Sequence, residues 1–158
     1  MNTIIPLHRF FRGAVLTGFC AVFLTALIPL ARAIPRQVTL EAIHQVENPR
    51  NVTRPGPAGE LGAYQFRPAT WAQHTDRPFR DALDRRWADL VAARHYDWLC
   101  ERLAKNGLEP SVYNVALAWN AGLTATVRGV APRRSHAYAI RVGNLAADFH
   151  GRTMVASR

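Results

Sequence analysis

The sequence predicts a compact, mainly α-helical domain, and three observations support this fold class. Apolar residues recur every three or four positions over long stretches, glycine and proline concentrate between those stretches, and the alternating pattern of strands is scarce. With 158 residues the chain is long enough for one domain with a real hydrophobic core.

The first 33 residues are expected to be a signal peptide that precedes this domain. Basic residues at positions 8–12 are followed by a mostly apolar, uncharged run over 14–30, and residues 31–33 have the small-x-small form of a cleavage site. The mature protein is then the domain 34–158, periplasmic or secreted, with no stable membrane span after processing. An uncleaved anchor is the alternative, because the apolar run is close to the roughly 20 residues that a spanning helix needs.

The chain is basic, with a formal charge of +9 that falls to +6 when residues 1–33 leave with their three arginines. Such a charge attracts polyanions. Outside a cytoplasm these are teichoic acid, lipopolysaccharide or the peptide carboxylates of the wall, and nucleic acid is not an expected partner. Only Cys100 remains after cleavage, so no internal disulfide forms, and its place in a helical stripe predicts a buried small side chain.

The first helix of the domain is expected over residues 40–47. Leu40, Ile43 and Glu47 have the spacing of one helix face, and Pro49 ends the helix because it disfavours the α conformation at the residue before it. A carboxyl group on the apolar side of a helix C-terminus loses solvation and faces the negative end of the helix dipole. Both effects raise its pKa, which makes Glu47 a candidate general acid.

The segment that follows the first helix is expected to be irregular. Prolines and glycines over residues 48–62 predict a surface loop or a small irregular hairpin, and residues 63–66 are too short to classify. Pro68 fits the first turn of a short helix over 68–73.

Three further helices are predicted from apolar stripes and end signals. The longest is expected over 81–105 with a stop at 106–107, the next begins at Pro110 and breaks at 120–122, and Ser135 is expected to cap the last. Their stripes comprise Leu83, Trp87, Leu90, Val91, His95, Trp98, Leu99 and Leu103 in the first, Val112, Ala116 and Trp119 in the second, and Tyr138, Val142, Leu145 and Phe149 in the third.

Several familiar active-site motifs have no match in the sequence. It lacks a glycine-rich phosphate loop, a Gly-x-Ser-x-Gly elbow, a Cys-x-x-Cys pair and a His-Glu-x-x-His helix. His44 and Glu47 are spaced to face one metal ion, but the further inward acids of a carboxylate metal site are absent. His95 lies on an apolar stripe and is expected to be a core histidine. No metal and no cofactor are therefore expected.

Three short motifs follow one another along the chain: residues 45–47 read QVE, residues 57–71 read PAGELGAYQFRPATW, and residues 115–122 read VALAWNAG. In this order they resemble the motifs of soluble lytic transglycosylases and goose-type lysozymes. The family pattern is Glu-Ser, then Gly-Ala-x-Gly-Leu-Met-Gln-x-x-Pro-x-Thr, then Ala-Tyr-Asn-Ala-Gly. A Tyr-x-x-Arg-Val run at 138–142 also looks like its closing helix, so the resemblance spans nearly all of 38–148.

The resemblance implies a lysozyme-like helical fold that acts on peptidoglycan glycan strands, with Glu47 as the single catalytic acid. In this chemistry the acid protonates the oxygen between N-acetylmuramic acid and N-acetylglucosamine, and the substrate's N-acetyl group assists. Glu47 then acts as the base. Abstraction of a proton from the sugar's own 6-hydroxyl gives an anhydro ring, whereas activation of water gives hydrolysis.

The resemblance also implies substrate-binding roles at matching positions. Gln65 matches the motif glutamine and Tyr64 replaces the methionine beside it. Asn120 matches the asparagine of Asn-Ala-Gly, where its alternative role is a helix-end cap. Tyr138 is placed to hold Glu47 or to pack in the core, and Glu60 is either a second cleft carboxylate or, as we expect, a solvated loop charge.

One further position departs from the family pattern, and two tryptophans are also candidates for substrate contact. Asn48 stands where the family has a serine that supports the catalytic glutamate, although an asparagine amide can also donate a hydrogen bond. Trp71 is a candidate for stacking on a sugar ring. Trp119 is another, but core packing is the expected role there.

The sequence therefore predicts a lytic transglycosylase that cleaves without hydrolysis and leaves 1,6-anhydro ends. Its small size suggests a bare catalytic domain, which by analogy alone opens the wall locally for a secretion or conjugation apparatus. A muramidase that hydrolyses the same bond and a non-catalytic wall-binding module are the alternatives. A basic nucleic-acid-binding helical protein fits the charge but not the expected export.

Overall fold

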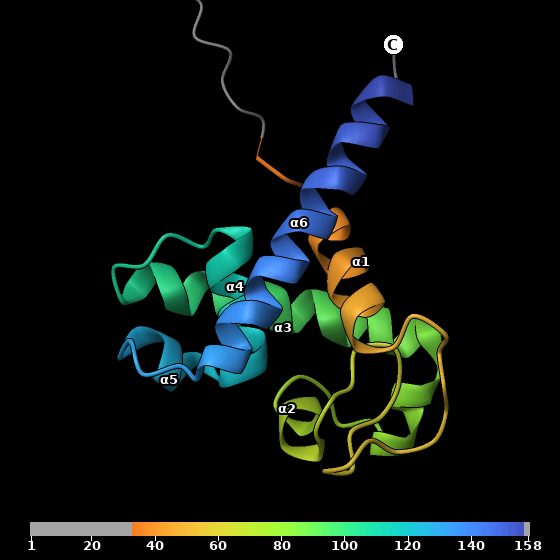
Figure 1. Cartoon of the computed structure of the whole chain (residues 1–158). Helices are drawn as coiled ribbons and strands as arrows, with labels where there is room; N and C mark the ends of the chain where they lie inside the picture. Colours follow the sequence, from red (N-terminus) through yellow and green to blue (C-terminus); the bar gives the residue numbers. More distant parts are fainter. Residues whose placement is uncertain (1–32, 157–158) are drawn as a thin grey trace, which may run out of the picture. The chain divides into compact units, whose positions relative to one another are not determined.

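The computed structural model describes residues 33–156, and Figure 1 shows their arrangement. The signal peptide expected over residues 1–33 lies, apart from Ala33, outside these residues. The helical elements are α1 (Arg36–Glu47), α2 (Pro68–Ala72), the 3₁₀ helix η1 (Phe79–Leu83), α3 (Arg85–Lys105), α4 (Val112–Ala121), α5 (Leu123–Val127) and α6 (Arg133–Ala156). Within the described part no strand forms, and a single isolated bridge joins Leu61 to Phe66. The predicted mainly helical class is confirmed.

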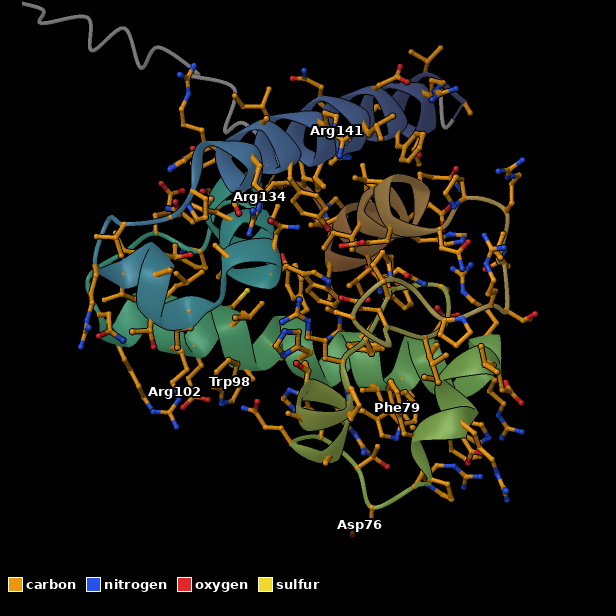
Figure 2. All side chains as sticks on the ribbon, turned by 60° about the horizontal axis from the view of Figure 1, so that its bottom comes forward. Asp76, Phe79, Trp98, Arg102, Arg134 and Arg141 are labelled. Carbon is orange, nitrogen blue, oxygen red and sulfur yellow. The ribbon has the colours of Figure 1, made fainter. Side chains whose placement is uncertain are left out.

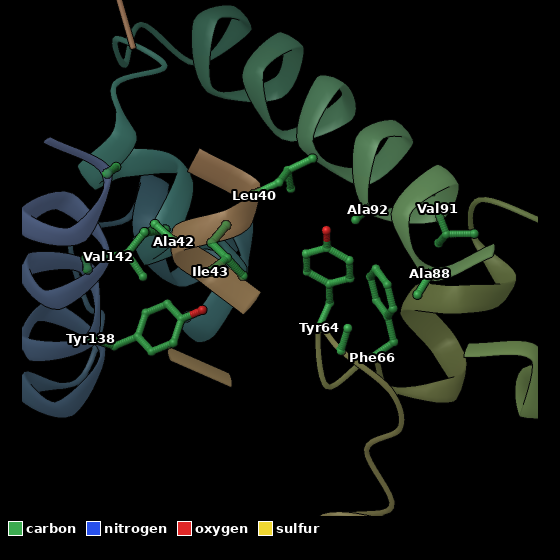
Figure 3. Close-up of a cluster of buried hydrophobic side chains, with 14 of the residues drawn as sticks. Leu40, Ala42, Ile43, Tyr64, Phe66, Ala88, Val91, Ala92, Tyr138 and Val142 are labelled. Atoms are coloured by element: carbon green, nitrogen blue, oxygen red, sulfur yellow. The ribbon is translucent and has the colours of Figure 1, made fainter. Parts of the chain in front are cut away.

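The main core lies between α1, α3, α4 and α6 and the segment that precedes α2 (Figure 3). From α1 it takes Leu40 and Ile43, and from α6 it takes Tyr138 and Val142. Each fully buried aliphatic side chain contributes roughly 1.5–3 kcal/mol to folding. This burial fixes the C-terminal end of α1, and therefore Glu47, against α6.

A second buried cluster joins the C-terminal half of α3 to α4. It consists of Leu99, Leu103, Val115 and Ala118, with Cys100 half-buried beside it. Burial raises the pKa of the Cys100 thiol. Cys100 is thus a neutral packing residue. It is only partly buried, whereas the sequence predicts a buried side chain.

His95 is a core histidine, as its position on the stripe predicts. It is 7% exposed, its Nδ1 lies 2.9 Å from Nε2 of His74, and its ring stacks on Trp98. Burial lowers the pKa of His95 to about 3, so the ring is neutral at ordinary pH.

The expected single helix over 81–105 is wrong, because Asp84 interrupts it. Asp84 has an extended backbone with ψ 117° and its side chain accepts a hydrogen bond from the Arg86 N–H, which makes it the N-cap of α3. Leu83 and Leu90 are 41% and 43% exposed and do not belong to the buried stripe. Acidic caps that satisfy free N–H groups at a helix start explain this break.

Other helix starts also differ from the expectation. Contrary to the sequence prediction, Pro110 does not open α4. The helix is capped instead by Ser111, whose side chain accepts a hydrogen bond from the Asn114 N–H. Ser135 is not a cap: α6 begins at Arg133, and the Ser135 N–H donates to the Pro132 carbonyl while the side chain is buried. The short helix α5 follows Gly122 directly and was not predicted.

No helix in the described residues has the length and apolar content needed to cross a bilayer.

Candidate active site

Glu47 is the last residue of α1 and opens onto a pocket of about 370 Å³, here called the Glu47 pocket. Asn48 leaves the helix with φ −153°, so the chain turns away at the predicted residue. The pocket is lined by Glu47, Asn48, Val52, Arg54, Pro55, Gly56, Pro57 and Gln65. The acid and the wall around it therefore come from adjoining parts of the sequence.

The carboxyl group of Glu47 is held by α6. Tyr138 is 5% exposed, and its hydroxyl donates a hydrogen bond of 2.8 Å to Glu47 Oε1. Burial raises the pKa of Glu47 from 4.5 to about 7; the Tyr138 hydrogen bond and the Arg141 charge oppose this shift, and the Glu60 charge adds to it. A carboxyl group with this pKa can both give and take a proton near neutral pH.

Glu60 is a second carboxylate beside the same pocket. A Cβ atom on Gly56 would lie 2.7 Å from Glu60 Oε2 and 2.8 Å from Gln65 Oε1, so both side chains lie against the pocket wall. Glu60 accepts from the Ala58 N–H at 2.8 Å, and Arg67 Nε lies 3.4 Å from its other oxygen.

The prediction that Glu60 is a solvated loop charge is only partly right. Its side chain is 16% exposed, and protein groups contribute to stabilising its charge. Hydrogen bonds from its own backbone and from Ala58 lower its pKa, and Arg67 contributes further. The pKa values of Glu47 and Glu60 therefore move in opposite directions, which is the arrangement that separates an acid from a base.

Asn48 closes the loop that forms the pocket wall. Its Nδ2 donates to the carbonyls of Val52 at 2.9 Å and Gly62 at 3.2 Å, and its Oδ1 accepts from the Val52 N–H at 2.8 Å. None of its hydrogen bonds in the described structure reaches Glu47. Asn48 thus supports the site through the loop, and not by a hydrogen bond to the acid.

Gln65 faces the pocket from a strained backbone position. Its φ is +48°, which lies in the left-handed region of backbone conformation. Residues other than glycine adopt this region at a cost of about 1 kcal/mol or more. Its Nε2 donates to the Gly62 carbonyl at 3.0 Å. The structure therefore brings Gln65 to the same pocket as Glu47, as the motif predicts.

Two aromatic assignments are corrected by burial. Tyr64 is 2% exposed, and its hydroxyl donates to Asp89 on α3 at 2.7 Å, so it is a core residue and not a substrate contact. Trp71 is 1% exposed with its Nε1 bonded to the Arg77 carbonyl, so it cannot stack on a sugar. Trp119 packs against core rings, as expected.

Neither Asn120 nor His44 is among the residues that line the Glu47 pocket. Asn120 is exposed in the last turn of α4. His44 is 3% exposed; Arg85 donates to its Nδ1, and its Nε2 lies 3.1 Å from Asn51 Oδ1. His44 is therefore engaged in a structural network with Arg85 and Asn51.

Two arginines of the site were not predicted as functional residues. Arg54 lines the pocket from the loop, and nothing in the loop sequence distinguishes it from its neighbours. Arg141 acts on Glu47 through its charge. Its position three residues after Tyr138 places both on adjoining parts of α6, a helical spacing that could have identified it.

Removing the Tyr138 hydroxyl should raise the pKa of Glu47 further. In Tyr138→Phe the charged form of Glu47 loses the hydrogen bond that stabilises it, while burial of the ring is kept. A pH titration of the Glu47 side-chain carbon by NMR should show the midpoint above that of the wild type. Tyr113→Phe, whose hydroxyl bonds His136 instead, is the control. An unchanged or lower midpoint in Tyr138→Phe would contradict the assignment.

Comparisons of this chain with protein-family models, with curated proteins and with solved structures give no match.

Proposed function

We propose that this protein is a peptidoglycan lytic transglycosylase with a lysozyme-like fold. It acts outside the cytoplasm on the bond between N-acetylmuramic acid and N-acetylglucosamine, with Glu47 as acid and base. The observation that carries the proposal is a carboxyl group with a pKa of about 7, held by Tyr138 at the edge of a pocket. No metal or cofactor enters the proposed chemistry.

The proposed reaction has two steps that share one proton carrier. Protonated Glu47 donates its proton to the glycosidic oxygen, the bond from that oxygen to C1 of the muramic acid breaks, and the N-acetyl oxygen of the same sugar stabilises C1. The Glu47 carboxylate then takes the proton of the 6-hydroxyl as that oxygen bonds to C1. The acid is regenerated, and the product carries a 1,6-anhydro ring. The attacking hydroxyl is already part of the bound sugar, which avoids the entropy cost of recruiting water.

A muramidase is the second candidate, and Glu60 is the observation that favours it. Glu60 is ionised, lies against Gly56 of the same pocket and acts electrostatically on Glu47. A carboxylate with a lowered pKa beside a protonated acid is the pair that inverting hydrolysis requires, with water attacking C1 and Glu60 taking its proton.

Digestion of purified sacculi separates these candidates. The expected result is soluble muropeptides whose masses are one water lower than those of hydrolysed fragments, with no reducing end. Products with the full water added, and their loss in Glu60→Gln, would establish the muramidase. Retention of the protein on sacculi without release of soluble fragments would leave only wall binding.

A further inference from the structure

The positive charge of the domain is unevenly distributed along the chain. Residues 36–109 carry eleven basic and ten acidic residues and are nearly neutral, whereas residues 110–147 carry four arginines and no acid. Those arginines are Arg128, Arg133, Arg134 and Arg141, and all four are exposed. The segment that forms α4, α5 and the first half of α6 is therefore the source of most of the surplus charge.

A second cavity lies where this basic segment meets α3. Its volume is about 710 Å³, and we call it the Trp98 pocket. It is lined by Trp98, Arg102, Asn106, Ala121, Gly122, Leu123, Thr124, Ala125, Arg128 and Val130. The lining contains two guanidinium groups, an aromatic ring and several small apolar side chains, but no carboxylate.

The charged groups of this pocket are available to a ligand. Arg102 and Arg128 take part in none of the ion pairs found in the described part of the chain. Trp98 and Arg102 project from the same side of α3, four residues apart, and the guanidinium carbon lies 5.7 Å from the Trp98 ring centre (Figure 2). His95 stacks on Trp98 with an interplanar angle of 15°, which holds the ring in place.

We propose that the Trp98 pocket binds the carboxylate-bearing peptide stem of the glycan substrate. This inference rests on the proposed function and names a second, separate site on the same substrate. Guanidinium groups pair with carboxylates through two parallel hydrogen bonds. The side chains of Leu123 and Val130 suit the methyl groups of an alanine-containing peptide, whereas an unsubstituted polyol phosphate backbone has no methyl group to place against them.

Chain continuity places this pocket beside the end of α4. Ala121 and Gly122 line the pocket and follow directly after the exposed Asn120, where the motif resemblance expects a contact with the glycan. A glycan that contacts Asn120, which lies outside the Glu47 pocket, can reach the Trp98 pocket through a chain that branches from it. The stem peptides of peptidoglycan are such branches.

Calorimetric titration of the protein with a soluble tetrapeptide tests the proposal. The probe is L-alanyl-γ-D-glutamyl-L-lysyl-D-alanine, and its twin has both free carboxylates converted to amides. We expect the free peptide to bind at least about tenfold more tightly than the diamide. This preference should disappear in Arg102→Gln/Arg128→Gln. It should persist in Arg80→Gln/Arg86→Gln, which removes the same charge from exposed positions outside the pocket.

A second variant guards against an indirect effect of the lost charges. Trp98→Leu should weaken both peptides while keeping the preference for the free carboxylates, since it removes the aromatic wall and leaves the arginines. Far-ultraviolet circular dichroism checks that each variant is folded. Equal binding of the two peptides by the wild type, or an unchanged preference in Arg102→Gln/Arg128→Gln, overturns the proposal.

Peptide binding needs no turnover, so its failure is distinct from failure of the proposed enzyme. If the protein binds the free peptide but releases nothing from sacculi, the assignment of the Trp98 pocket stands and the proposed transglycosylase activity is rejected. If it cleaves sacculi but binds the two peptides equally, only the assignment of the Trp98 pocket is rejected. Retention of duplex DNA that is lost in Arg102→Gln/Arg128→Gln, together with no peptide binding, assigns this basic surface to nucleic acid and overturns the proposal.

Discussion

Replacing Glu47 with glutamine should abolish glycan cleavage while the helical fold is kept. The amide matches the carboxyl group in shape and can still accept the Tyr138 hydrogen bond, but it cannot carry a proton to the glycosidic oxygen. General acid catalysis is worth roughly 100- to 10,000-fold in rate, so release of soluble fragments from sacculi should fall by at least about 100-fold.

Glu41→Gln is the matched control for this loss of activity. Glu41 lies on the same helix, but its carboxylate accepts hydrogen bonds from Gln45 and Arg85 and does not line the Glu47 pocket. Its rate on sacculi should stay close to that of the wild type. Retention of more than a few percent of the wild-type rate by Glu47→Gln would reject Glu47 as the catalytic acid.

The same Glu47→Gln variant should be more stable than the wild type at alkaline pH. The pKa of Glu47 is raised from 4.5 to about 7 in the folded protein, so the folded state binds the proton more tightly than the unfolded state. The stabilisation from this proton is fully present below pH 4.5 and is lost as pH rises through about 7. Glutamine does not ionise, so the variant avoids this loss.

Thermal unfolding at several pH values measures this difference. The two proteins should have similar midpoints near pH 4.5, and the variant should gain an advantage of at most roughly 3 kcal/mol by pH 8. Glu41→Gln should show no such gain, because the pKa of Glu41 is lowered. A Glu47→Gln advantage that does not grow with pH would show that the carboxyl group is not buried as described.

Replacing Gly62 with alanine should destabilise the whole domain and remove the site with it. Gly62 is buried with φ +79°, and a Cβ atom there would lie 1.8 Å from the carbonyl oxygen of Ala82. Its own carbonyl accepts hydrogen bonds from Asn48 and Gln65, so moving this backbone also displaces the pocket wall. We expect a loss of about 3 kcal/mol or more and a fall in the unfolding midpoint of roughly 10 °C.

Gly59→Ala separates this clash from the conformational cost alone. Gly59 has nearly the same φ of +78°, but nothing lies within 4 Å of the position of its missing Cβ. Its replacement should cost only about 1 kcal/mol. Similar midpoints for the two variants would show that η1 does not pack on Gly62 as closely as the structure has it.

The position of the acid could be predicted because its causes are local. The spacing of Leu40, Ile43 and Glu47 and the effect of Pro49 act within one helix and its end, and the structure ends α1 at Glu47. For Tyr138 the sequence leaves two roles open, contact with Glu47 or packing in the core, and the structure combines them: the ring is buried and the hydroxyl donates to Glu47.

The errors arise where contacts between distant residues decide the outcome. Tyr64 sits in a segment too short to show a period, and its burial depends on Asp89 in α3, 25 residues further along the chain. The break in the predicted 81–105 helix depends on a cap at Asp84 that competes with an otherwise continuous apolar stripe. Two protein groups stabilise the Glu60 charge: the Ala58 N–H, which precedes it in the chain, and the Arg67 side chain, which follows it. The spacing of residues in the sequence does not reveal that both lie next to Glu60.

The strained backbone of Gln65 has a consequence for how this chain would evolve. Glycine occupies φ +48° without strain, so a library at position 65 selected only for thermal resistance should accumulate glycine. The same library selected for release of wall fragments should retain glutamine, because glycine removes the amide from the Glu47 pocket. If both selections converged on glycine, the strain at this position would have no role in catalysis, and position 65 would be free for stabilising design.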